Sequence, residues 1–462
     1  MFTMRYKHNA FAAGLALLLP ALALAKVPEE QAQRLGKDLT PFGAEVAGNA
    51  DGSIPAWSGK WRGVPPGVEY AGPKSKAVSP YADEKPLFSI TAENYAQYKD
   101  RLSEGQAALF ERYPSFRMDV YPSHRDFNYQ QRMIDKAAWN ARNTELTHDA
   151  EGLKQYTGGI AFPIPDGPEQ VLWNTRSNYC HNTLNGISDA YGVFANGERA
   201  HEAQDFAQSI PFNDPDNPIP TTEEVVGEYI AFAFGERLAP PRLKGEVTVA
   251  QEPVDYKNSA RNAWQYRPDT RRVRKAPAVG YDNPDGPGGL QTIDDNEGFN
   301  GALDRFTYTL LGKREIYIPY HNYILNDPRR GDLDDRLTVN HMNPDYLRYE
   351  LHRVWIVEGN LAPGKRHAYS KRRWYVDEDS WNFVLSENFD SRGNLWRVGF
   401  FASIYQYDIE CYAKQITVFH DLPSGHYMLR WVTLERDEVD YTVPYRDKSY
   451  YTPAYVRKSV KR

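Results

Sequence analysis

Residues 349–389 decide the fold class: YELHRVWIVEGNLAPGKRHAYSKRRWYVDEDSWNFVLSENF. The stretch holds three runs rich in valine, isoleucine, tyrosine, phenylalanine and tryptophan, at 349–361, 367–377 and 381–389, separated by short polar turns. Such runs favour β-strands. Links of a few residues join antiparallel neighbours, because a parallel pair needs a crossover of a dozen or more residues. The stretch therefore predicts three consecutive antiparallel strands.

A pattern that alternates with a period of two residues, as in a β-strand, continues outside this stretch. Further strands are predicted at 245–251, 262–267, 306–319, 395–404, 414–420 and 427–434. Before residue 240 the signals are helical instead, at 91–110, at 129–146 and from Pro168 onward. We predict an α+β fold in which a helical and irregular region, 26–240, packs on an antiparallel sheet, 241–462, in one integrated domain.

The first 25 residues have the pattern of a secretory signal peptide. A positive start with Arg5 and Lys7 precedes an apolar stretch, and Ala23-Leu24-Ala25 supplies a small-residue cleavage site. Cleavage after Ala25 and a periplasmic location are therefore expected. In an oxidising compartment Cys180 and Cys411 can form a disulfide, and two buried free thiols are the alternative.

Composition and motifs exclude several classes of function. The chain has 55 Lys+Arg against 61 Asp+Glu, a net charge of -6, which argues against nucleic acid as the main partner. None of the usual nucleophile, zinc-protease, phosphate-loop or dinucleotide motifs is present. His352 and His367 could meet across a hairpin, but no third metal ligand can be named, and Asp294 and Asp295 are expected to be solvated. We predict no catalytic residues, no metal and no cofactor.

Aromatic residues are the positive signal. The chain contains 32 tyrosines, 20 phenylalanines and 10 tryptophans, many of them in the predicted strands. Such rings suit a concave site for an apolar ligand, and ordinary core packing is the alternative. The candidates for a ligand cavity are Trp264, Tyr266, Phe306, Tyr308, Trp355, Trp374 and Trp396.

Two clusters of cations lie on predicted strands. They are candidates for a docking face or for a clamp that holds an acidic head group, and a solvated outer face is the alternative. The candidate residues are Arg271, Arg272, Arg274, Arg372 and Arg373. The basic tail, 446–462, is expected to pack as a terminal strap through its tyrosines.

Several motifs resemble a known family. The run 263–268 with 271–274 resembles the strand–turn–strand signature of bacterial outer-membrane lipoprotein-sorting proteins. The runs 350–355, 366–372 and 375–381, with 36–41 and 48–57, are similar to a periplasmic branch, domain-of-unknown-function family 1329. The resemblance implies a strongly curved, unclosed antiparallel sheet with helices over its concave face. It also implies an RND-type exporter or an outer-membrane β protein as a partner.

These observations lead to two functional hypotheses. The first is a periplasmic protein that binds or shuttles a lipid or other hydrophobic molecule between the inner and outer membrane systems, without catalysis. The second is an envelope scaffold or regulator that docks a partner protein through the cationic strands.

Overall fold

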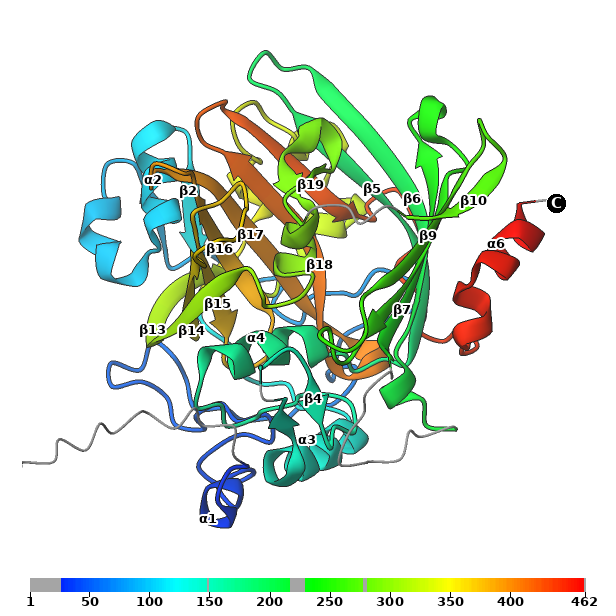
Figure 1. The fold of residues 1–462 in the computed structure, drawn as a ribbon. Helices are drawn as coiled ribbons and strands as arrows, with labels where there is room; N and C mark the ends of the chain where they lie inside the picture. Colours follow the sequence, from blue (N-terminus) through cyan, green and yellow to red (C-terminus); the bar gives the residue numbers. More distant parts are fainter. Residues whose placement is uncertain (1–25, 148, 217–228, 277–280, 461–462) are drawn as a thin grey trace, which may run out of the picture.

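A single 15-stranded sheet dominates the computed structural model, which describes residues 26–147, 149–216, 229–276 and 281–460 (Figure 1). Its strand order is β1-β2-β14-β15-β16-β17-β18-β19-β5-β6-β7-β8-β9-β10, with β13 beside β14. All pairs are antiparallel except the contact between β2 and β14. The two ends of this order do not pair with each other. The predicted α+β class with a large, unclosed antiparallel sheet is confirmed.

Strands after residue 240 lie close to their predicted positions. They are β8 (Val247–Pro253), β9 (Asn262–Arg267), β10 (Arg272–Lys275), β13 (Phe306–Pro319), β14 (Tyr349–Leu361), β15 (Lys371–Asp377), β16 (Phe383–Phe389), β17 (Leu395–Gln406), β18 (Cys411–Asp421) and β19 (His426–Val432). Short strands β1 (Phe88–Thr91) and β2 (Arg117–Val120) extend one edge, and two separate two-stranded ladders pair β3 (Glu145–Leu146) with β4 (Leu153–Lys154) and β11 (Pro284–Asp285) with β12 (Gln291–Thr292).

Three long strands before residue 240 were not expected. They are β5 (Thr183–Val193), β6 (Arg199–Ser209) and β7 (Tyr229–Ala239). The sequence of β6, RAHEAQDFAQS, is rich in residues that favour helices, so its local preference points away from a strand. Pairing with β5 on one side and β7 on the other overrides that preference. The predicted boundary at residue 240 is therefore not a structural boundary, because the sheet uses strands from both sides of it.

Most helices are short. They are α1 (Glu29–Ala32), α2 (Glu104–Arg112), α3 (Gln131–Asn143), α4 (Pro168–Ser177), α5 (Leu333–Arg336) and α6 (Pro453–Ser459). The helix predicted over 91–110 is interrupted, because Leu102 is extended and α2 begins only after Ser103, whose side chain caps it in a capping box with Gln106. Helix α2 contacts β16 and β17, and α4 contacts β13 and β14.

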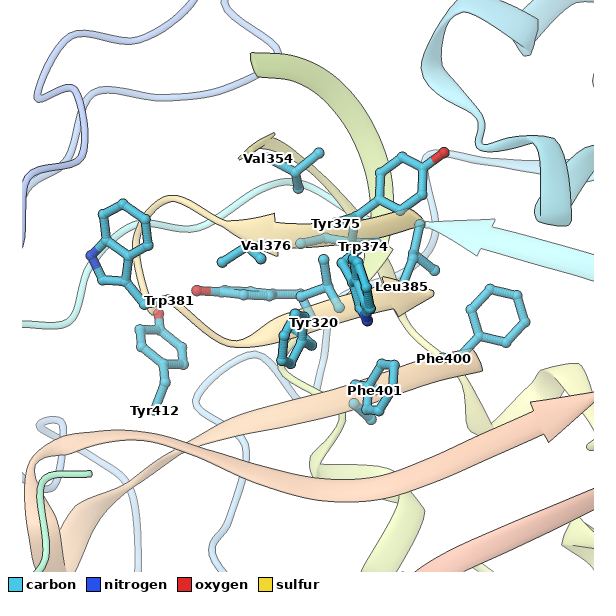
Figure 2. Packing of buried hydrophobic residues seen from close by; sticks show 14 of the residues in the cluster. Tyr320, Val354, Trp374, Tyr375, Val376, Trp381, Leu385, Phe400, Phe401 and Tyr412 are labelled. Atoms are coloured by element: carbon cyan, nitrogen blue, oxygen red, sulfur yellow. The ribbon is translucent and has the colours of Figure 1, made fainter. Parts of the chain in front are cut away.

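The sheet between β13 and β18 is packed solid with large side chains (Figure 2). Trp374 and Trp381 are fully buried, and each indole N–H donates to a backbone carbonyl, of Gly298 at 3.0 Å and of Phe42 at 2.8 Å. Buried indoles need such partners. The second carbonyl belongs to the irregular N-terminal chain, which is thereby fixed to this half of the sheet.

The C-terminal segment packs as the predicted strap. Tyr451 and Val456 are fully buried against Phe232, Val247 and Val249 on the outer face of β7 and β8. Helix α6 lies beside β9 and β10 (Figure 1). No helix within the described ranges is long and apolar enough to cross a membrane. The expected signal peptide, residues 1–25, lies outside the described residues.

Cys180 and Cys411 are joined in a disulfide that links the loop before β5 to the first residue of β18. The bond spans 231 positions of sequence, so it restricts a very long loop in the unfolded chain. Long-loop disulfides typically stabilise by about 2–5 kcal/mol.

We predict that replacing both cysteines by serine lowers the free energy of unfolding by about 2–5 kcal/mol. Urea unfolding of the variant and of the oxidised wild type measures the difference. Wild-type protein treated with a reductant is the control and should match the variant. Equal stability of the oxidised and reduced forms would contradict the assignment.

Candidate functional site

A cavity of about 370 Å³ lies on the concave face of the sheet. Its wall uses residues of β5, β6, β7 and β8 on one side and of β18 and β19 on the other. In a flat sheet β18 and β8, five neighbours apart, would be separated by about 24 Å. Both border one hollow because the sheet is strongly curved, as the ribbon also shows (Figure 1).

Small side chains keep this part of the sheet hollow. On β7 the sequence Ala231-Phe232-Ala233-Phe234-Gly235 alternates strictly, and Phe232 and Phe234 pack outward on the tyrosines of the strap. Ala233 and Gly235 line the cavity, and Phe234 borders it between them. A methyl group added at Gly235 would meet only the side chain of Gln204, at 3.9 Å. The alternation thus gives β7 one filled face and one open face.

Trp431 projects into the cavity because β19 is irregular at this point. Between the pairs Leu429–Tyr191 and Val432–Asp189, two residues of β19 oppose one residue of β5, which is a β-bulge. Trp431 itself has a positive φ of 63°, a rare conformation for a bulky residue. Bulges change the direction of a side chain. The Trp431 ring meets the Phe206 ring edge-on at 5.1 Å, and together they give the wall an apolar surface.

Several polar groups of the wall are paired, whereas Asn296 Oδ1 and Asn382 Nδ2 have no hydrogen-bond partner among the described residues. His181 and Gln208 share a hydrogen bond of 3.0 Å, and Lys414 forms an ion pair with Glu297 at 3.6 Å. Arg430 is paired with Asp285. Burial lowers the pKa of His181 to about 4, although the bond to Gln208 opposes the shift. The imidazole is therefore neutral at pH 7.

The seven predicted aromatic residues are not part of this wall. Trp264 and Tyr266 face outward and pack against the strap. The remaining five lie in or beside the packed half of the sheet. Phe306 and Tyr308 contact Trp374, Trp355 stacks on Trp381, and Trp396 donates to Asp421. These rings pack against other side chains of the protein, the alternative left open by the sequence.

The sequence contained a usable signal for the real wall. Strict alternation of phenylalanine with alanine and glycine over 230–235 indicates a strand with one bulky face and one small face. No such pattern marks Trp431, because a bulge changes its direction. His181 and Phe206 are likewise recognisable only from the pairing of β5 with β6 and the curvature of the sheet.

Two of the predicted docking cations are engaged inside the protein. Arg372 is fully buried and binds Asp294 at 2.7 Å and Asp295 at 2.6 Å. These two carboxylates were expected to be solvated, but the structure shows them buried. Arg373 binds Glu358 at 2.9 Å and Glu387 at 3.1 Å. The prediction of a docking role is corrected for Arg372 and Arg373: both form structural ion pairs, since their strand β15 lies between two neighbouring strands inside the sheet.

The other three docking candidates, Arg271, Arg272 and Arg274, are exposed on the last strand of the sheet and the turn before it. His367 bonds Asp294, whereas His352 belongs to a different cluster, so the two histidines do not share a site.

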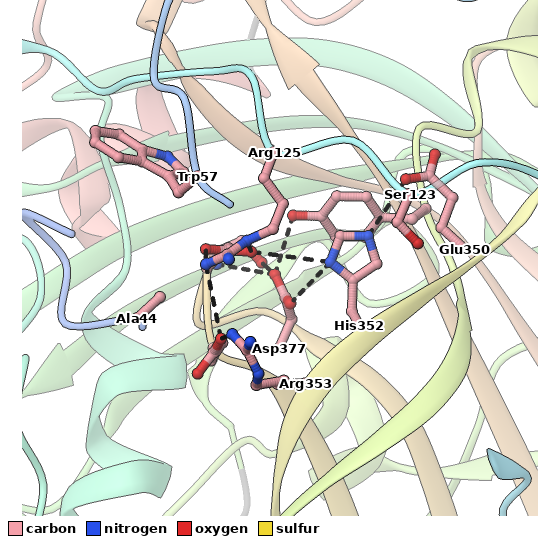
Figure 3. Close-up of polar contacts among 12 residues, drawn as sticks. Ala44, Trp57, Ser123, Arg125, Glu350, His352, Arg353 and Asp377 are labelled. Carbon is pink, nitrogen blue, oxygen red and sulfur yellow. Dashed lines mark hydrogen bonds and ion pairs between the residues drawn. The ribbon is translucent and has the colours of Figure 1, made fainter. Parts of the chain in front are cut away.

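That cluster is a buried network of charges built from the motifs at 350–355 and 375–381 (Figure 3). Arg125 donates two hydrogen bonds to Asp379, at 2.7 and 2.8 Å. His352 Nδ1 lies 3.8 Å from a carboxylate oxygen of Asp377 and 3.8 Å from one of Asp379. Its Nε2 faces Glu350 at 3.3 Å. All five side chains are at least nine-tenths buried.

The electrostatics of this network favour an imidazolium. Burial alone would lower the pKa of His352, but the nearby carboxylate of Asp379, the hydrogen bond to Glu350 and the charge of Asp377 outweigh it and raise the pKa to about 9. Burial and the nearby charge of Asp379 raise the pKa of Asp377 to about 6. Although His352, Asp377 and Asp379 have a spacing that could hold a metal ion, Arg125 and the imidazolium already supply the positive charge. We interpret the network as the anchor of β14 to the β15–β16 turn.

We predict that Glu350→Gln destabilises the protein by about 3–5 kcal/mol, because removing one partner of a buried pair leaves a charge uncompensated. Glu350 accepts from Arg348 at 2.7 Å and from His321 at 2.8 Å, and the charge of Arg348 and the hydrogen bond from His321 hold the pKa of the Glu350 carboxyl well below its usual value against the effect of burial. Denaturant unfolding checks the loss. Glu198→Gln, on an exposed turn, is the control and should be neutral.

The neutral state of His181 leads to a prediction about how the stability of the protein depends on pH. Its pKa is lower in the folded chain, about 4, than in an unfolded chain, about 6.5. The unfolded state therefore binds the proton first, so stability is intact above pH 6.5 and is lost as the pH falls toward 4. Between pH 7.5 and 5.0, wild type should lose about 2 kcal/mol more than His181→Gln. Parallel pH dependences of the two proteins would contradict the assignment.

Comparisons with known proteins find similar sequences and structures. An uncharacterized protein of Pseudomonas aeruginosa is 37% identical over 449 residues, covering 96% of each chain. A crystal structure of a DUF1329 family protein from Desulfovibrio piger aligns with TM-score 0.40 and 11% identity over 60% of this chain and 92% of that one. A domain from Vibrio parahaemolyticus, described as an outer membrane lipoprotein-sorting protein domain, aligns with TM-score 0.41 and 11% identity over 63% of this chain and 98% of that one.

The family assignment rests on sequence. Residues 89–457 match the family described as protein of unknown function (DUF1329). This range includes the charged motifs around His352 and Asp377 and every strand that lines the cavity. The chain therefore belongs to the DUF1329 family, as its motifs predict.

Proposed function

We propose that this protein binds a hydrophobic molecule in the concave cavity and carries it, without chemical change, through the periplasm. The observation that supports this proposal is the hollow itself. The sheet is packed solid between β13 and β18, whereas between β5 and β8 the same sheet presents alanine and glycine to a space of about 370 Å³. Pockets of about 300–1,000 Å³ are typical of small-molecule sites.

The energetics explain why a carrier needs such a hollow. Each methylene group removed from water contributes about 0.8 kcal/mol, so an unshielded chain of about fourteen carbons costs on the order of 11 kcal/mol. Trp431 and Phe206 provide apolar contact area in the wall. The pairs His181–Gln208 and Lys414–Glu297 bond each other and add a polar boundary beside it. This arrangement supports binding rather than catalysis.

The disulfide is consistent with an extracytoplasmic location, where such bonds persist. It also borders the cavity, because Cys180 is one of the lining residues. We further propose that the cargo is exchanged with a membrane partner. An RND-type exporter or an outer-membrane β protein is the class that the family resemblance implies. The docking candidates that remain exposed for such a partner are Arg271, Arg272 and Arg274. Arg372 and Arg373 are already engaged in ion pairs within the protein.

Filling the cavity tests the proposal directly. Ala233→Trp places a large ring in the hollow and should reduce uptake of a fluorescent acyl-chain probe by at least about tenfold, a loss of about 1.4 kcal/mol. The same substitution at the exposed Ala454 on α6 is the matched control and should bind as wild type does. Circular dichroism confirms that both variants fold. Undiminished uptake by a folded Ala233→Trp variant would place the ligand elsewhere and overturn the assignment of the site.

A further inference from the structure

Pairs of residues directly opposite each other on neighbouring strands, which we call rungs, lead from the cavity to two arginines at the edge of the sheet. In an antiparallel pair, residues directly opposite each other share a face. Gly235 opposes Thr248, Thr248 opposes Gln265, and Gln265 opposes Arg274. Gly235 and Thr248 line the cavity, so Arg274 lies on the cavity face, two strands beyond Thr248.

Arg272 lies on the same face, because it is two positions from Arg274 along β10. The residues between and beside them belong to the opposite face: Val273 opposes Tyr266 and Lys275 opposes Trp264, and both rings pack against the strap. The cationic strand is therefore divided into two faces. The predicted docking surface treated Arg271, Arg272 and Arg274 as a single group, without this division between faces.

The distance between cavity and arginines suits a ligand that bridges them. Neighbouring strands are about 4.8 Å apart, so Arg274 begins about 10 Å from Thr248 along the rung. Thr248 is an exposed member of the wall, which places an opening of the cavity on this side. A long guanidinium side chain extending back along the face can reach the polar end of a molecule whose apolar part lies inside.

Charge pairing distinguishes these two arginines from the other cations near the cavity. Lys414 and Arg430 on the wall are paired with Glu297 and Asp285, and Arg237, on β7, is paired with Glu202. On the rung nearest the turn, Arg267 faces Glu246 at 3.6 Å and Asp269 at 3.4 Å. Across the described part of the chain, no carboxylate lies within 4 Å of the guanidinium of Arg272 or Arg274.

We propose that Arg272 and Arg274 hold the anionic head group, a carboxylate or a phosphate, of an amphipathic ligand whose apolar chain occupies the cavity. The inference rests on the proposed function and specifies its ligand class. The planar guanidinium fork matches the geometry of both anions and can bind either in bidentate fashion. An exposed position keeps the head group in contact with water, so the ligand does not need to bury its charge in the cavity.

The test compares matched ligands and matched variants. Three probes share one acyl chain length: a fatty acid, its methyl ester and the corresponding alkyl phosphate. The double variant R272Q/R274Q removes both charges from the cavity face, and R271Q/K275Q removes two charges from the turn and the opposite face of the same strand. Dissociation constants come from competition with a fluorescent acyl probe at low and at physiological salt.

We expect wild type to prefer the acid or the phosphate over the ester, and R272Q/R274Q to weaken the preferred anion about tenfold while leaving the ester unchanged. R271Q/K275Q should bind all three probes as wild type does. Comparison of acid with phosphate tells the two head groups apart. Equal affinity of wild type for ester and anions, or an equal loss in both double variants, would overturn the inference while leaving the cavity assignment intact. If wild type binds none of the probes, the proposed function itself fails.

Discussion

The backbone ladder between β19 and β5 joins the strands of the C-terminal half to those that precede residue 240. The cavity depends on this ladder, because β18 and β19 form one part of its wall and β5 to β8 form the other. The Cys180–Cys411 disulfide reinforces the same junction covalently. Antiparallel pairing fixes which residues face inward along each strand, and the curvature of the sheet then determines what those faces enclose.

The two halves of this sheet use their inner faces differently. Around β14 to β17 the interior is filled by large rings and by a buried charge network centred on His352, which fixes the strands rigidly. Around β5 to β8 many of the lining residues are alanine, glycine, threonine and glutamine, with Phe206 among them, and space remains. A rigid half beside a hollow half is well suited to binding, since the hollow keeps its shape without being filled by the protein's own side chains.

Sequence reasoning identified the elements whose local pattern agrees with their environment. The strands β9, β13 and β14 lie at the predicted residues because they alternate strongly or are rich in β-branched and aromatic side chains. It missed β5 and β6 because strands that line a hollow lack the hydrophobic pattern of core strands, and it missed β7 although residues 231–235 alternate strictly. The rings predicted for a ligand cavity, such as Trp374, fill the core, while the cavity wall combines small residues with Phe206 and with Trp431, which is redirected by a bulge. Burial of Arg372 depends on a distant segment, Asp294–Asp295, and no local pattern could reveal it.

We propose that the hollow of the curved sheet holds a hydrophobic molecule in the cell. Native mass spectrometry of protein purified from its own envelope, followed by solvent extraction, measures this directly. We expect a bound species of discrete mass that is released on denaturation and recovered in the organic phase. Repeated isolation of the protein at its bare polypeptide mass, with nothing extracted, would contradict it.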